Sequence, residues 1–97
     1  MGISNLINDR GNAAANQFVI NTKNATYFQS YASVVAKLQR GKKPVLSSHW
    51  DYSNTTTKHL YIFLRDNGYY VSGRNDVLRM IKDKEIIVKK ECSLALV

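Results

Sequence analysis

Four cations close together give the sequence its clearest chemical signal. Residues 37 to 43 hold Lys37, Arg40, Lys42 and Lys43 with no acidic residue between them. On a turn, these charged groups project into solvent and can contact phosphates, each contact releasing roughly one counterion. An acidic protein surface could accept the same contacts. The same residue types also suit a turn that contacts no partner, where the charges keep the turn solvated and discourage pairing at a sheet edge.

Aromatic side chains and further cations extend this hypothesis. Tyr27, Tyr31 and Trp50 could offer flat rings on which unpaired bases stack. Trp50 also fits the alternative role of a core aromatic. Lys58 and Arg65 are seven positions apart, so they share one side of a predicted helix. We therefore predict a binding surface for an anionic partner, made of Lys37, Arg40, Lys42, Lys43, Lys58, Arg65, Tyr31 and Trp50.

Two histidines are the main candidates for catalysis or metal binding. His49 lies two residues before Asp51, and His59 is placed on the predicted helix. A catalytic histidine needs a group that orients it and a nucleophile within reach, and this spacing fixes neither. We predict no enzyme activity, no catalytic residue, no metal site and no cofactor. A small hydrolase or nuclease that uses His49 and Asp51 is kept as an alternative.

The overall composition excludes several classes of protein. The chain has 97 residues with 14 Lys and Arg against 7 Asp and Glu, a net charge of +7, so it is no acidic mimic of nucleic acid. Its apolar runs hold about five residues, far below the roughly 20 needed to cross a bilayer. Cys92 is the single cysteine, which excludes an internal disulfide and favours a reducing compartment. The first residues show no pattern of a secretory signal.

The order of predicted elements indicates the fold. Runs rich in aromatic and β-branched residues predict strands, and apolar residues at helical spacing predict helices. Asp51, Ser53 or Asn54 can cap the first helix, and Asn75 the second. The expected strands are 17–20, 26–31, 33–39, 45–49 and 86–88, and the expected helices are 55–66 and one that follows Asn75. This order predicts a small single α+β domain over residues 17–97, with an antiparallel sheet of four to five strands covered on one face by two helices. Residues 1–16 are expected to form an N-terminal arm or short helix.

One part of the sequence resembles a known group of proteins. The segments Gln17-Phe18-Val19-Ile20, 26–31 and Trp50-Asp51-Tyr52-Ser53, followed by Thr55-Thr56 and Lys58, resemble small uncharacterised proteins of tailed bacteriophages. The likeness spans roughly residues 12 to 64, and the stretch 69–97 lies outside it. The resemblance transfers no activity to any residue of this chain.

What the resemblance implies is a biological context. It suggests an accessory phage protein made in the cytoplasm of an infected bacterium, without a membrane partner. Proteins of this kind often act by binding and blocking a host or defence complex, such as a CRISPR-Cas effector, or by coating nucleic acid. We therefore expect a non-enzymatic inhibitor of a nucleoprotein complex that acts through basic surfaces. The alternative expectation is an accessory protein that binds nucleic acid directly.

Overall fold

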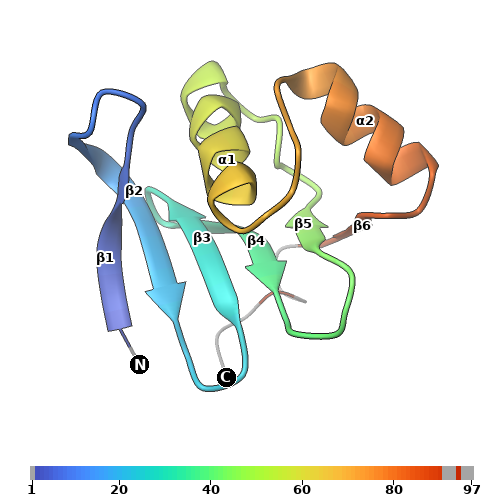
Figure 1. Cartoon of the computed structure of the whole chain (residues 1–97), viewed down its shortest axis with the longest axis horizontal. Coiled ribbons are helices and arrows are strands. Elements are labelled where there is room, and N and C mark those ends of the chain that lie inside the picture. Colours follow the sequence, from blue (N-terminus) through green and yellow to red (C-terminus); the bar gives the residue numbers. More distant parts are fainter. Residues whose placement is uncertain (1, 91–93, 95–97) are drawn as a thin grey trace.

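A computed structural model describes residues 2–90 and 94, and in this part of the chain it shows six strands and two helices (Figure 1). The elements in chain order are β1 (Gly2–Ile7), β2 (Ala13–Asn21), β3 (Thr26–Ser30), β4 (Ser33–Leu38), β5 (Val45–Ser47), α1 (Asn54–Asp66), α2 (Arg74–Lys82) and β6 (Ile87–Lys89). All six strands form one sheet in the order of the sequence. The predicted α+β class with two helices is confirmed.

The sheet is mixed rather than fully antiparallel. Strands β1 to β5 form an antiparallel meander, whereas β6 pairs parallel to β5. Both helices lie between β5 and β6, so the chain crosses over the sheet and returns in the same direction. The pairing places Val45 beside Ile87. The sequence predicts four to five antiparallel strands; the additional strand is β1, and the parallel pair follows from the helical crossover.

The N-terminal residues form a strand, which corrects the prediction of an arm or short helix over residues 1–16. Strand β1 is an edge strand paired with β2, with Gly2 opposite Asn21 and Ile3 opposite Ile20. Apolar residues at positions 3, 6 and 7 suit one helical turn, but Leu6 alone enters the core. The long neighbouring strand β2 satisfies the backbone of this segment, so tertiary pairing decides its structure.

Helix α1 is built as its sequence predicts. Ser53 caps it by accepting a hydrogen bond from the Thr56 backbone N–H at 3.1 Å. Its buried face includes Leu60, Phe63 and Leu64. The helix ends at Asp66, and Gly68 follows with a φ of 91°, a left-handed conformation that glycine adopts without strain.

Helix α2 begins one residue before the predicted cap. Gly73 occupies the N-cap position and gives no side-chain bond, so Asn75 is not the cap. Instead, the Asp76 carboxylate accepts hydrogen bonds from the Ser72 hydroxyl at 2.6 Å and from the Ser72 N–H at 2.8 Å. These bonds favour the charged form, and they lower the pKa of Asp76. A carboxylate in the first turn thus holds the residue that precedes the N-cap and lies near the positive end of the helix dipole.

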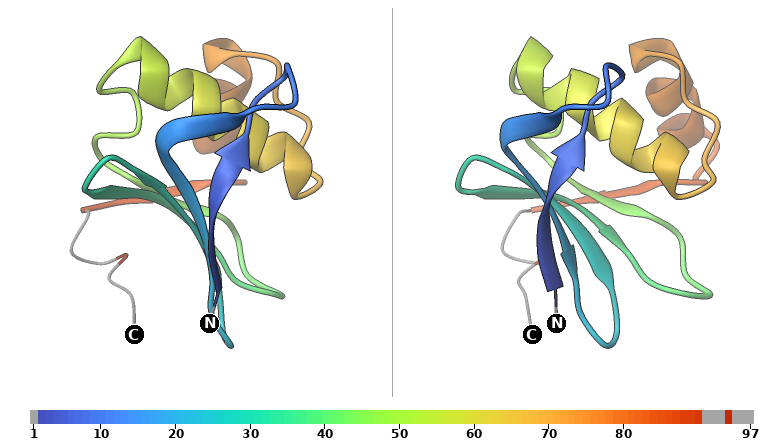
Figure 2. Two further views of the ribbon diagram at one scale, coloured as in Figure 1. Left: turned by 90° about the vertical axis from the view of Figure 1, so that its left-hand side faces the viewer. Right: turned by 60° about the vertical axis from the view of Figure 1, so that its left-hand side comes forward.

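Both helices cover one face of the twisted sheet, and the main core lies between these layers (Figure 2). Phe28 of β3 and Phe63 of α1 stack at its centre, with ring centroids 5.5 Å apart. A smaller cluster of Ile20, Ala25 and Tyr27 is also buried. The β3–β4 turn and the β4–β5 loop lie at opposite ends of β4, so this strand carries one candidate site at each end (Figure 1).

Candidate functional site

The β4–β5 loop brings three of the predicted cations to one groove. Arg40, Lys42 and Lys43 are exposed and line a groove of about 710 Å³ between this loop and the C-terminal ends of both helices. Gly41, with a φ of 76°, allows the tight turn that presents them. We call this surface the basic groove; its lining is Thr26, Leu38, Gln39, Arg40, Gly41, Lys42, Lys43, Pro44, Asn67, Tyr69, Met80 and Glu85.

The cations of the basic groove have no ion-pair partner within residues 2–90. The ion pairs in this part of the chain join Arg65 to Asp9, Arg74 to Asp51 and Arg79 to Asp76. Glu85 is the single acidic residue of the groove lining. The positive charge of the groove is therefore available to an external anion.

Lys37 lies next to this loop but belongs to a different environment. It is half-buried on β4, directly opposite Tyr27 of β3, and its ammonium group lies 5.7 Å from the centre of the tyrosine ring. Such a contact between a cation and an aromatic face favours the observed position of the side chain. Lys37 does not line the groove. The charge of Lys37 adds to the positive field around the loop. Its half-buried aliphatic part and its contact with the Tyr27 ring stabilise the fold.

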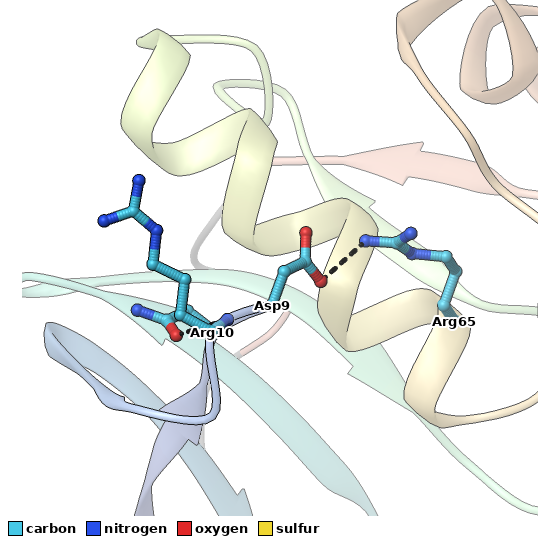
Figure 3. Close-up of polar contacts among 4 residues, drawn as sticks. Asp9, Arg10 and Arg65 are labelled. Carbon is cyan, nitrogen blue, oxygen red and sulfur yellow. Dashed lines mark hydrogen bonds and ion pairs between the residues drawn. The ribbon is translucent and has the colours of Figure 1, made fainter.

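The two predicted cations of α1 do not join the groove lining. The Arg65 guanidinium reaches Asp9, in the turn after β1, at 3.4 Å (Figure 3). Both side chains are well exposed, so this ion pair contributes about 0–1 kcal/mol to stability. Its main effect is to compensate the Arg65 charge at the β1–β2 hairpin. Lys58 is exposed near the start of α1 and contributes to a separate face.

The aromatic residues do not surround the basic groove as the sequence predicts. Trp50 is 5% exposed in the core, and the Arg74 guanidinium lies 5.6 Å from its ring centre, so no free face is left for a base. Tyr27 is 2% exposed. Tyr31 is exposed, but it lies at the other end of β4, roughly 17 Å away at about 3.3 Å per residue. The aromatic ring in the groove is that of Tyr69, which the sequence does not single out.

A second cleft, of about 810 Å³, opens at the end of β4 that carries Tyr31. Hydroxyl groups dominate its lining, and none of its lining side chains is an acid, a lysine or an arginine. We call it the hydroxyl cleft; it is lined by Ser30, Tyr31, Ala32, Ser33, Val35, Ser47, His49, Tyr52, Ser53, Thr55 and Thr56. The sequence shows a polar stretch at Asp51 to Lys58, but the contribution of the β3–β4 turn appears only in the folded chain.

Hydroxyl groups in the lining of this cleft are joined by hydrogen bonds between β3 and α1. The Ser30 and Thr56 hydroxyls lie 3.0 Å apart, and both residues are buried. The Ser53 hydroxyl donates to the Thr56 hydroxyl at 3.1 Å. This chain of bonds fixes the start of α1 against the end of β3 and gives the cleft a rigid polar wall.

Tyr31 is held in a strained conformation beside this wall. Its φ is 56°, in the left-handed region that bulky side chains rarely adopt. Its N–H donates to the Asn16 carbonyl at 2.7 Å, and its own carbonyl accepts from the Gln29 amide at 2.7 Å. These bonds hold the turn in place although a left-handed conformation costs roughly 1–2 kcal/mol.

This strain predicts an unusual order of stability among substitutions. We expect Tyr31→Gly to be more stable than Tyr31→Ala by about 1 kcal/mol, because both lose the ring but only glycine relieves the strain. The expected difference in Tm is roughly 4–8 °C, measurable by thermal denaturation followed by circular dichroism. Tyr52 has no positive φ and serves as the control, since Tyr52→Gly should be no more stable than Tyr52→Ala. The same order at both positions would contradict the strain.

The two histidines have different surroundings. His49 lines the hydroxyl cleft, but Asp51 forms its ion pair with Arg74 at 2.9 Å instead of orienting that histidine. The His59 ring bonds to its own helix, with Nδ1 donating to the Thr55 carbonyl oxygen at 2.7 Å. Among the described residues, no group of three or more histidine, cysteine and acidic side chains could hold a metal ion. Cys92 lies outside the described residues.

The described helices are too short or too polar to cross a membrane.

A comparison with protein families matches residues 1–86 to a family of unknown function, DUF8033. The chain belongs to this family. The match includes strands β1 to β5, both helices, the basic groove and the hydroxyl cleft, and it ends just before β6. Comparisons with curated proteins and with solved structures give no match.

Proposed function

We propose that the protein is a non-enzymatic binding protein whose basic groove contacts an anionic macromolecule. One observation carries this proposal: Arg40, Lys42 and Lys43 line one open groove and have no ion-pair partner within residues 2–90. Exposed cations in a concave surface attract anionic partners and accelerate their association. Tyr69 gives the groove an aromatic side chain that could pack against such a partner.

We further propose that the partner is a host or defence nucleoprotein complex, such as a CRISPR-Cas effector, which the protein inhibits in the cytoplasm of an infected bacterium. The support for this context is the resemblance of residues 12 to 64 to small phage proteins. A nucleoprotein complex offers both phosphates and acidic protein grooves, and the basic groove suits either. Direct binding to free nucleic acid is the second candidate, favoured by the lysines and arginine of the loop.

Capture from a bacterial lysate with three baits tests this function. The groove variant carries Arg40→Ser, Lys42→Ser and Lys43→Ser. The matched control variant carries Arg10→Ser, Lys89→Ser and Lys90→Ser, which removes one arginine and two lysines from exposed positions outside the groove. Both variants have the same net charge, so a general charge effect would change them equally.

We expect the wild type and the control variant to recover the same stoichiometric partner and the groove variant to lose it. Treatment of the lysate with nuclease separates the two candidates, because a partner held only through free nucleic acid should disappear. Equal recovery by the groove variant would show that the groove is not the contact surface. Recovery of no partner by the wild type would count against the inhibitor role.

A further inference from the structure

We propose that the hydroxyl cleft binds an unpaired nucleobase. This inference goes beyond the proposed function, because the cleft and the basic groove share no lining residue and lie at opposite ends of β4. The cleft has a volume of about 810 Å³, within the range of roughly 300–1,000 Å³ that is typical of small-molecule sites. A base with its sugar fits in this volume.

The polar groups of the cleft suit an uncharged heterocycle. Serine and threonine hydroxyls both donate and accept, so a hydroxyl that is already bonded within the wall keeps further hydrogen-bonding capacity. The cleft gathers six such hydroxyls from Ser30, Ser33, Ser47, Ser53, Thr55 and Thr56. The edge of every nucleobase presents donors and acceptors side by side, so this lining can pair with different bases. The absence of charged carboxylates from the lining removes a source of repulsion against the neighbouring phosphates.

Two tyrosines supply the aromatic surfaces that a base requires. Tyr31 and Tyr52 line the same cleft and are 55% and 81% exposed. Stacking on an exposed aromatic ring favours every base, because each has a π-face. Tyr31 also keeps a strained backbone conformation that its turn holds in place.

A buried amide lies next to the inner wall of the cleft. Gln17 of β2 is directly opposite Ser30 of β3, so their side chains share one face of the sheet. Gln17 is fully buried, and its Oε1 and Nε2 have no hydrogen-bond partner among the described residues. Buried amides are nearly always hydrogen-bonded, and this unbonded one lies behind Ser30 without lining the cleft itself.

A polyanion carrying the base is favoured over a neutral sugar. The net charge of +7 concentrates nucleic acid near the protein surface, whereas a free saccharide gains nothing from this field. A sugar ring stacked on the tyrosines is therefore an outcome of the test and not the occupant proposed.

Fluorescence of 2-aminopurine tests the site directly, because stacking on an aromatic ring quenches the emission of this base. The first probe is 2-aminopurine riboside, which has no phosphate and so does not report on the basic groove. We expect the wild type to quench it and Tyr52→Ala to weaken the binding about ten-fold. Tyr70→Ala is the matched control, since Tyr70 is 83% exposed outside the cleft and should bind as the wild type does.

A second probe separates this inference from the basic groove. It is a single strand of thymidines with one central 2-aminopurine. We expect the groove variant to lower the affinity for this strand but to keep the full quench at saturation, whereas Tyr52→Ala should reduce the quench and Tyr52→Phe should retain it. Equal behaviour of Tyr52→Ala and Tyr70→Ala would overturn the proposal. So would competition by free glucose but not by adenosine, or no quenching of the riboside by the folded wild type.

Discussion

Serine at positions 40, 42 and 43 is expected to weaken binding to a single strand of about 20 nucleotides by roughly 10- to 100-fold at about 50 mM salt. Arg40, Lys42 and Lys43 are the exposed cations of the basic groove, and each phosphate contact that is lost also loses its released counterions. Fluorescence anisotropy of a labelled strand measures the change. The substitutions lie in an exposed loop away from the core, so the variant should keep the fold.

The control for this prediction is the variant with serine at Arg10, Lys89 and Lys90. It loses the same number of charges from exposed positions outside the groove. We expect its affinity to stay within about two- to three-fold of the wild type, because a diffuse change of charge acts weakly through the screening of about 10 Å at moderate salt. An equal loss in both variants would mean that net charge, and not the groove, governs binding.

Phe63→Ala is expected to destabilise the protein by about 3–5 kcal/mol. Phe63 is fully buried on α1, and its ring stacks on Phe28 of β3 with centroids 5.5 Å apart. Truncation removes this contact and leaves a cavity where the helix layer meets the sheet. Unfolding in urea, followed by circular dichroism, measures the loss, which corresponds to a decrease in Tm of more than about 12 °C.

Phe63→Leu is the control for this prediction, because it keeps most of the side-chain volume. It should cost clearly less than the alanine variant. A loss below about 1 kcal/mol for Phe63→Ala would contradict the packing of α1 on the sheet. If the alanine variant does not fold, the leucine variant still gives a measurable decrease in stability.

Elements that depend on interactions between nearby residues can be predicted from the sequence. Helix α1 has a serine cap, apolar residues at helical spacing and a terminal Asn67-Gly68, and all three signals act within one segment. The hairpin of β2 and β3 is likewise marked by its aromatic and β-branched runs. These elements follow from short-range physical chemistry, so prediction and structure agree.

Elements that depend on pairing with residues far away in the sequence cannot be predicted from the sequence in this way. Strand β1 has the apolar spacing of a helical turn, and only its pairing with β2 makes it a strand. The direction of β6 follows from the crossover through both helices and not from Ile87 to Lys89 themselves. A sequence pattern carries no information about such long-range pairing.

In the candidate sites, too, some features can be predicted from the sequence and others depend on the fold. The basic loop is visible as a run of cations, and its exposure agrees with that pattern. The orientation of the aromatic residues is not visible in the sequence, because Tyr31 and Trp50 both lie in turns that follow strands, yet Trp50 is buried and Tyr31 is exposed. The hydroxyl cleft combines segments near positions 30 and 53 that only the fold brings together.

The salt dependence of oligonucleotide binding tests the central claim, that the basic groove is the surface for an anionic partner, most directly. The measurement plots the logarithm of the binding constant against the logarithm of the salt concentration for the wild type, the groove variant and the control variant. We predict that the slope of the groove variant is shallower than that of the wild type by about 2, since three phosphate contacts each contribute roughly 0.7 for a single strand. The slope of the control variant should equal that of the wild type. Identical slopes for all three proteins would contradict the claim.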